Sequence, residues 1–235
     1  MSGWARKRFW TAAEVEPEAG GFGIRLDGRP VCTPGRAPLV VPTRTLAELI
    51  AAEWAAQGEQ IRPETMPATR AANSAIEKVR ANRAEVAALI AAYGESDLLC
   101  YRAGHPAELV ARQEAAWDPL LDWAAQRYGI RWQVVQGVMP VAQPPETVAR
   151  LTAEVARLDP FRLTAFHDLV ALPGSLVIGL AAAEGVAEAE SLWQAAQIDE
   201  DWQAEQWGQD DEASAAAQHR KTGFLDALRF FRACD

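Results

Sequence analysis

Apolar and polar residues alternate along the first forty residues in the two-residue period of β-strands. The segment 22–26 places an apolar side chain at every second position, as expected for a half-buried strand. The Asp27-Gly28 pair that follows favours a hairpin, because both central positions of a type I′ turn need positive φ. Further strands are expected around residues 9–15 and 39–41, so the pattern predicts a small N-terminal sheet.

Beyond residue 42 the hydrophobic period becomes that of a helix. An apolar stripe that starts at Leu46 ends with Trp54 on the same helical face. Thr45 has capping-box spacing to Glu48, which predicts Thr45 as the N-cap. The stripe predicts Trp54 as a structural residue of the core and not a contact residue, so that Trp54→Ala would cost roughly 3–5 kcal/mol.

The remainder of the chain shows mostly the helical period. Asp118-Pro119 has the form of an N-cap with a first-turn proline, which predicts a new helix there and gives Asp118 a structural role as its cap. Residues 130–135 are the one late stretch that favours a strand. The predicted helices include residues 76–79, 86–93, 106–117, 118–129, 147–158, 160–171, 175–184, 187–206 and 211–232.

Together these patterns predict an α+β fold in two parts. A small β-rich domain covers residues 1–62, and a larger all-helical domain, resembling an orthogonal bundle, covers residues 63–235. Prolines at positions 63 and 67 mark the linker between them.

Composition narrows the class of protein. The 235 residues carry 23 Lys and Arg against 32 Asp and Glu, which argues against general nucleic-acid binding. Three widely spaced cysteines form no disulfide framework and suit a reducing compartment. The longest uncharged run, residues 169–183, is too short to span a bilayer, and no secretory or transit segment precedes the first strand. We therefore expect a soluble intracellular protein with no membrane insertion.

The common catalytic devices are missing from the sequence. It has no phosphate loop, no Gly-x-Ser-x-Gly elbow and no His-Glu-x-x-His pair. His167 is more typical of a packing histidine than of a base, and the apolar setting of Cys100 indicates a buried, inert thiol. We expect no catalytic residue, no cofactor and no metal.

A block of one charge sign stands out in the C-terminal half. Residues 163–219 contain eleven Asp or Glu and no Lys or Arg. Solvated helix faces normally mix both signs, whereas a block of one sign creates a field that steers partners of opposite charge.

The centre of this block, residues 198–208, interleaves acidic residues with tryptophan and admits several interpretations. Ile198 and Trp202 could form a core-facing stripe with a solvated acidic back. The segment could instead be a protein-binding surface, since Trp is enriched where binding energy concentrates. A metal site is disfavoured, because successive carboxylates on a helix point about 100° apart. Two alternative functions remain at this point. The protein could be an enzyme that uses the carboxylates of residues 199–212 as acid, base or metal ligands, or it could be a scaffold protein with another partner.

A second constellation lies on a helix rich in small residues. Arg70 and Asn73 are three positions apart there and are assigned structural roles. An arginine on a closely packed helix usually has a carboxylate partner, and the acidic block is the obvious supplier.

These stretches resemble a known family, the assembly chaperones of the F-type ATP synthase that bind its α subunit (the Atp-twelve family). The resemblance runs from about residue 6 to residue 212. It is carried by the following segments: Arg8-Phe9, Gly21-Phe22, 26–30, Pro38-Leu39, 52–54, 65–73, 97–101, Gln113, 117–119, Gly174-Ser175 and 199–208. Ala68 and Ala71 depart from the family, which has larger apolar residues there.

The resemblance implies a non-enzymatic holdase that binds the unassembled α subunit until the β subunit arrives. It implies a fold with a small α+β N-terminal domain and a helical C-terminal domain. Because mitochondrial members begin with a targeting extension, which we do not find in this sequence, the resemblance also implies a bacterial member located in the cytoplasm. The acidic-Trp-Gln motif of the family maps onto residues 199–203, with Glu200 as the functionally required position. The predicted partner-binding residues are Glu200, Asp201, Trp202, Gln203 and Trp207. A cation for Glu200 could come from Arg70 or from the client.

Overall fold

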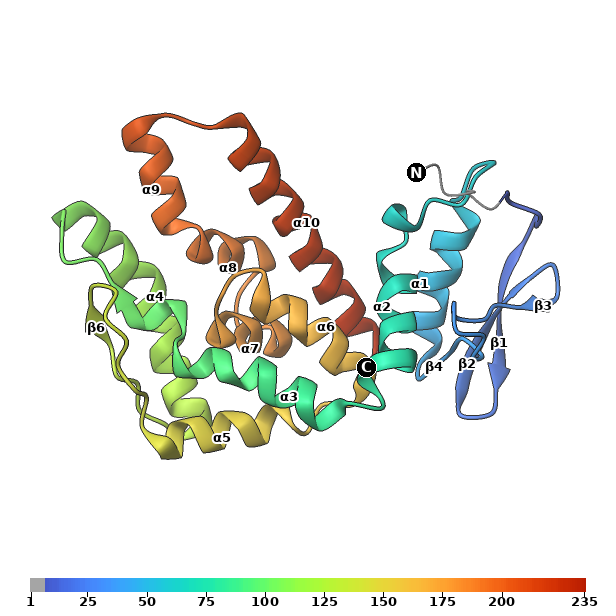
Figure 1. Cartoon of the computed structure of the whole chain (residues 1–235), viewed down its shortest axis with the longest axis horizontal. Coiled ribbons are helices and arrows are strands. Elements are labelled where there is room, and N and C mark those ends of the chain that lie inside the picture. The colour runs from blue at the N-terminus through green and yellow to red at the C-terminus, as the bar shows by residue number, and fades with distance from the viewer. Residues whose placement is uncertain (1–6) are drawn as a thin grey trace. The chain divides into compact units, whose positions relative to one another are not determined.

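The computed structural model describes residues 7–235, which form two compact units (Figure 1). The sheet unit contains the described residues up to 82 together with 159–165 and 229–235, and the helical unit contains 83–158 and 166–228. An N-terminal sheet followed by a larger helical part confirms the predicted α+β class. The division at residues 62 and 63 stays a prediction. Residues 1–6, part of the stretch searched for a targeting segment, lie outside the described residues.

The sheet of the sheet unit is antiparallel and follows the predicted alternation. Strand β2 pairs with β1, β3 and β4, and Ala13 of β1 lies opposite Leu26 of β2. The predicted hairpin turn is confirmed, with φ of 47° at Asp27 and 79° at Gly28. The strands are β1 (Ala13–Glu18), β2 (Gly21–Leu26), β3 (Arg29–Pro30) and β4 (Val40–Val41).

Helix α1 (Arg44–Ala55) lies against β1 and β2 (Figure 1). Its buried side chains include Leu46 and Ile50, as the apolar stripe requires. The predicted cap was wrong: the N-cap is Thr43, whose Oγ1 accepts a hydrogen bond from the Leu46 amide at 3.1 Å. The backbone of Thr43 is extended (φ −124°), the conformation that a cap residue needs.

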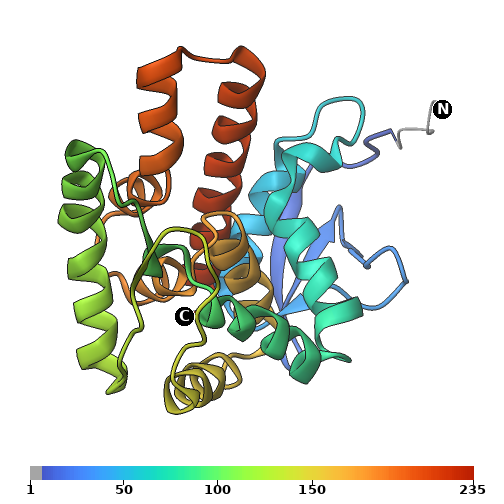
Figure 2. The same cartoon turned by 60° about the vertical axis from the view of Figure 1, so that its left-hand side comes forward.

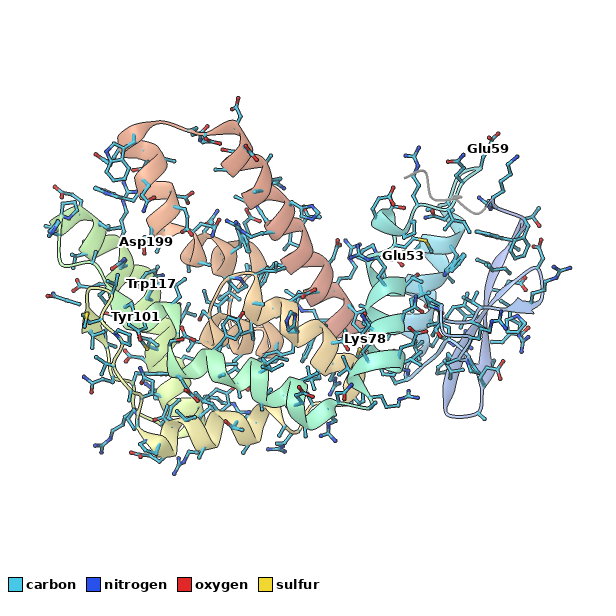
Figure 3. All side chains as sticks on the ribbon, viewed as in Figure 1. Glu53, Glu59, Lys78, Tyr101, Trp117 and Asp199 are labelled. Atoms are coloured by element: carbon cyan, nitrogen blue, oxygen red, sulfur yellow. The ribbon has the colours of Figure 1, made fainter. Side chains whose placement is uncertain are left out.

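A carboxylate of α1 fixes the start of α2. Glu53, labelled in Figure 3, accepts hydrogen bonds from the amides of Ala68 and Thr69 at 2.7 and 2.8 Å, and from the Thr69 hydroxyl at 2.7 Å. These amides have no partner inside the helix, and a negative charge there is favoured by the helix dipole. The other elements of this stretch are η1 (Pro63–Thr65), α2 (Pro67–Ser74) and η2 (Ala75–Val79), a π-helical turn.

The helical unit is arranged around a helix that is buried along most of its length. Seven successive residues of α7, Leu176 to Ala182, are buried, and α4 and α8 pack against this helix. The elements are α3 (Arg83–Ala91), η3 (Ala92–Glu95), η4 (Leu98–Cys100), β5 (Tyr101–Arg102), α4 (Ala107–Tyr128), β6 (Val135–Gln136), α5 (Pro145–Val155), α6 (Pro160–Ala171), α7 (Leu176–Glu184), α8 (Ala189–Ala196), α9 (Ile198–Trp207) and α10 (Asp211–Ala233). Helices α6 and α10 each contribute residues to both units. No helix among residues 7–235 is long and apolar enough to cross a membrane.

At two places the chain is divided into helices differently from the prediction. Helix α4 continues through Pro119, although proline cannot donate the backbone hydrogen bond that its position requires. Buried side chains on both sides, Trp117 and Leu121 among them, hold the two halves in line. The single helix expected over residues 187–206 is divided at Gln197 into α8 and α9.

A buried carboxylate joins two of the sequence segments that carry the resemblance, residues 97–101 and Gly174-Ser175. Asp97 accepts hydrogen bonds from the Leu99 amide (3.0 Å), the Ser175 hydroxyl (2.7 Å) and the Val177 amide (3.0 Å). Ser175 in turn caps α7 by accepting from the Ile178 amide. Burial raises the pKa of Asp97 to about 6, against the opposing effect of these hydrogen bonds.

Candidate client-binding surface

Helix α9 forms an acidic, aromatic surface of the helical unit. None of its ten residues is buried. Ile198 and Trp202 are half-buried, so the core-facing stripe is present only in part. Trp207 is 80 % exposed, which is unusual for so large an apolar side chain.

The first turn of α9 is fixed to α4 by a buried amide. Gln113 is 1 % exposed. Its Nε2 donates to Asp199 Oδ1 at 2.6 Å, and its Oε1 accepts from the Ala103 amide at 2.8 Å. Figure 3 labels Asp199 on α9 and Trp117 on the facing helix α4. The amide of Gln113 thus holds α9 in one position, and Asp199 contributes to this anchor rather than to the open surface.

A second contact between α4 and α9 neutralises part of the acidic block. Arg112 pairs with Glu205 at 2.8 Å, and its guanidinium lies 4.9 Å from the centre of the Trp202 ring. The hydrogen bond between Arg112 and Glu205 raises the pKa of the Arg112 guanidinium and lowers the pKa of the Glu205 carboxyl. No local sequence pattern pointed to Arg112, because it lies 93 residues before its partner.

Three of the predicted contact residues form no hydrogen bond or ion pair with these two anchors. Glu200, Asp201 and Gln203 are exposed, and neither carboxylate forms an ion pair within the described helical unit. Partial burial, together with the charge of Glu205, raises the pKa of Asp201. The arrangement leaves two adjacent carboxylates and the exposed Trp207 on one short helix.

The acidic field continues on the next helix. A short connection joins α9 to α10 (Figure 2). Asp210 precedes α10 and accepts a hydrogen bond from the Ala213 amide at 2.8 Å, and residues 211–216 are all exposed. Negative charge at these two helix N-termini is stabilised by the helix dipoles, so the one-signed block does not destabilise its own helices.

The residues assigned structural roles take different positions. Trp54 is half-buried and packs edge-to-face on Trp10, with ring centres 5.2 Å apart. Arg70 is exposed on α2 and forms no ion pair within the described sheet unit. The Trp54 Nε1 and Asn73 Oδ1 atoms are buried without a hydrogen-bond partner among the described residues.

The predicted capping role of Asp118 was wrong. Asp118 lies inside α4 and pairs with Arg102 at 2.6 Å. Arg102 is 8 % exposed, donates from Nε to the Leu99 carbonyl at 2.8 Å, and lies 5.2 Å from the ring of Trp117. Asp118 therefore neutralises a nearly buried arginine, which a local cap pattern could not reveal.

The chemistry available elsewhere is limited. Cys100 is buried, as predicted, and burial raises the pKa of its thiol to about 12, which disfavours the thiolate. His167 hydrogen-bonds its neighbour Asp168 at 2.8 Å, which raises the pKa of the imidazole. Among residues 7–235, no three His, Cys, Asp or Glu side chains lie close enough together to hold a metal ion.

Comparison with known proteins places this architecture in a family. Residues 7–125 match the family model described as ATP12 chaperone protein. A point variant of Atp12p from Paracoccus denitrificans is 48 % identical, covers 100 % of both chains and superimposes with a TM-score of 0.96. A protein of Agrobacterium tumefaciens described as a chaperone is 43 % identical over 97 % of this chain and 86 % of its own, with a TM-score of 0.93.

A curated relative extends the match to a eukaryote. The mitochondrial protein atp12 of Schizosaccharomyces pombe is 24 % identical over 214 residues, which cover 86 % of this chain and 74 % of that protein. The fold and the matched sequence define a chaperone. The chain belongs to the ATP12 chaperone protein family.

Proposed function

We propose that this chain is an assembly chaperone that binds the unassembled α subunit of the F-type ATP synthase and prevents its aggregation until it pairs with β. Family membership supports the chaperone role. The observation that carries the proposal is the α9 surface, where Glu200, Asp201 and Trp207 are exposed on a helix that Gln113 anchors.

The physical basis is that of a holdase. A free subunit exposes apolar surface that its partner will later cover, and such surface drives aggregation. A protein that binds this surface reversibly lowers the concentration of the exposed form by mass action. Release needs no nucleotide, because the β subunit competes for the same client.

The α9 residues suit a client that carries arginine among apolar side chains. Exposed Trp207 supplies an aromatic anchor, and Glu200 and Asp201 supply charges that favour a cationic partner. Arg112 keeps Trp202 in place, so this helix meets the client with one conformation already set, which reduces the entropy lost on binding.

The proposal includes the absence of catalysis, and work in the bacterial cytoplasm. Relatives from Paracoccus denitrificans and Agrobacterium tumefaciens support the bacterial setting. An enzyme based on the carboxylates of residues 199–212 would need them to converge, and Asp199 and Glu205 are already bound to Gln113 and Arg112.

Light scattering of the isolated α subunit from the same organism tests the proposal. We expect the purified chain to suppress scattering at equimolar ratio, equally with and without ATP. The unrelated client citrate synthase serves as the control for general chaperone activity. Equal aggregation of the α subunit with and without this chain would disprove the holdase function.

A further inference from the structure

Exposed large apolar side chains gather in one short segment of the helical unit, residues 134–141, which we name the apolar loop. The surrounding residues 132–145 contain no charged side chain. Such a concentration indicates an interaction site, whereas single exposed apolar residues need no explanation. Of nine such side chains in the described chain, four belong to this loop: Val134 (42 % exposed), Val138 (89 %), Met139 (75 %) and Val141 (36 %).

The base of the apolar loop is held in place. The side-chain amide of Gln143 accepts from the Gln133 amide and donates to its carbonyl, both at 2.9 Å. The Thr147 hydroxyl also stabilises the base of the loop, because it donates a hydrogen bond to the Arg131 carbonyl at 2.8 Å. Within the loop, β6 pairs in parallel with β5. The exposed side chains are therefore presented from a fixed base.

A cavity of about 350 Å³ lies between the apolar loop and α4, two segments that run beside each other in Figures 1 and 2. Residues of α4 spaced four apart form one wall, and β6 with the residue before it forms the other. The lining contains two carboxylates and one guanidinium. Arg102 pairs with Asp118, and Glu114 forms no ion pair within the described helical unit. The walls include Val110, Glu114 and Asp118 from α4, Val134 and Gln136 from the loop, and Arg102.

We propose that the apolar loop and this cavity form a second client contact, which binds a segment of the α subunit where apolar residues are flanked by Lys or Arg. The aliphatic stem of such a cation can pack between Val110 and Val134 while its charge reaches Glu114. The unpaired negative charge of Glu114 favours a positively charged segment of the partner, as the carboxylates of α9 do. This contact rests on the proposed function, because its occupant is the same client.

One residue links the two surfaces. Gln113 lines the cavity and also donates the 2.6 Å hydrogen bond to Asp199 of α9. The cavity and the acidic helix therefore lie on either side of one buried amide, and a single extended client segment can contact both.

The test is a binding titration of the full chain with the isolated α subunit, using the double variant Val138→Ser/Met139→Ser. Both side chains are exposed, so folding should be unchanged, which circular dichroism and thermal denaturation check. We expect binding at least about tenfold weaker, since two apolar contacts are lost. The matched control is Leu89→Ser/Val186→Ser, which replaces exposed apolar side chains elsewhere in the same unit and should bind like the wild type.

A second variant tests the charge of the cavity independently of the loop. Glu114→Gln should weaken binding severalfold at low salt and flatten its salt dependence. Glu108→Gln, an exposed carboxylate in the first turn of the same helix, should leave both unchanged.

The outcomes separate this contact from the proposed function. If the wild type binds no α subunit, both proposals fail. If the wild type binds and both test variants bind equally well, the second contact alone is overturned. Suppose that Val138→Ser/Met139→Ser leaves binding of the α subunit unchanged but dissociates a dimer of the wild type or abolishes its binding to lipid vesicles. The second client contact is then overturned, and the loop binds a second copy of the chain or a membrane surface instead.

Discussion

Glu200 and its neighbour Asp201 differ from the other two carboxylates of α9 because neither forms an ion pair within the described helical unit. Asp199 accepts a hydrogen bond from Gln113 and Glu205 pairs with Arg112. A cation for Glu200 must therefore come from outside the helical unit, either from Arg70 of the sheet unit or from the client. We favour the client, because Glu200 is exposed in the first turn of its helix, where its charge can act on an approaching partner.

The variant Glu200→Gln distinguishes the two sources. We expect the melting temperature to stay unchanged while binding of the α subunit weakens and becomes less dependent on salt. Thermal denaturation and titrations at two salt concentrations measure both effects, with Glu188→Gln, an exposed carboxylate before α8, as the control. A lowered melting temperature would point to Arg70, and wild-type behaviour in both assays would remove Glu200 from the binding surface.

Two tryptophans provide a matched pair for separating stability from binding. Trp54 is half-buried against Trp10, so Trp54→Ala should lower the free energy of unfolding by about 2–3 kcal/mol, below the range for a fully buried aromatic. Trp207 is 80 % exposed, so Trp207→Ala should change stability by less than about 0.5 kcal/mol and weaken binding instead. Urea denaturation and client titration test both; a stable Trp54→Ala protein that fails to bind would show that Trp54 is a contact residue.

At the scale of elements, the buried Asp97 links η4 to the start of α7 and makes that junction sensitive to pH. The ordinary pKa of an aspartate is 3.8, and burial raises that of Asp97 to about 6. Between these values the folded protein keeps a proton that the unfolded chain has lost, so the contribution of Asp97 to stability falls as pH rises.

The variant Asp97→Asn removes this titration. We expect the stability advantage of the wild type over the variant to be largest at pH 4 and to shrink by about 2 kcal/mol by pH 7. Urea denaturation at pH 4, 5, 6 and 7 measures the difference, with Asp122→Asn, which replaces an exposed aspartate of α4, as the control. A difference that does not change with pH would contradict the raised pKa.

The helical period predicted which segments are helices but not where contacts distant in sequence divide or extend them. Residues 160–171 were predicted as a helix, and α6 has the same bounds. The break at Gln197 has no proline or glycine to announce it. It lies just before Asp199, which Gln113 binds from 86 residues away. The continuity of α4 through Pro119 likewise depends on buried neighbours such as Trp117, which no local pattern records.

At the scale of the whole molecule, the acidic block could be recognised from the sequence, but the basic residues that neutralise part of its charge in the folded protein could not. Eleven carboxylates without a basic residue in the same segment are visible by inspection. The arginines that meet them, Arg112 with Glu205 and Arg127 with Glu184, lie outside the block and 93 and 57 residues from their partners. Lys221, just beyond the block, pairs with Glu190. The predicted surface is thus narrower than the block and is concentrated at α9 and the start of α10.

This concentration of charge predicts how the client approaches. A one-signed field raises the association rate of an oppositely charged partner by ten- to a thousandfold, and salt suppresses the effect. The Debye length falls from about 10 Å at 0.1 M salt to 3 Å at 1 M. We therefore expect the association rate of the α subunit to fall about tenfold or more between these concentrations, while the dissociation rate changes little. In stopped-flow measurements, the triple variant Glu200→Gln/Asp201→Asn/Glu212→Gln should associate more slowly than the wild type at 0.1 M salt. Its association rate should also lose most of its dependence on salt. An association rate that is equally salt-dependent in the variant would show that α9 and α10 are not the source of the field.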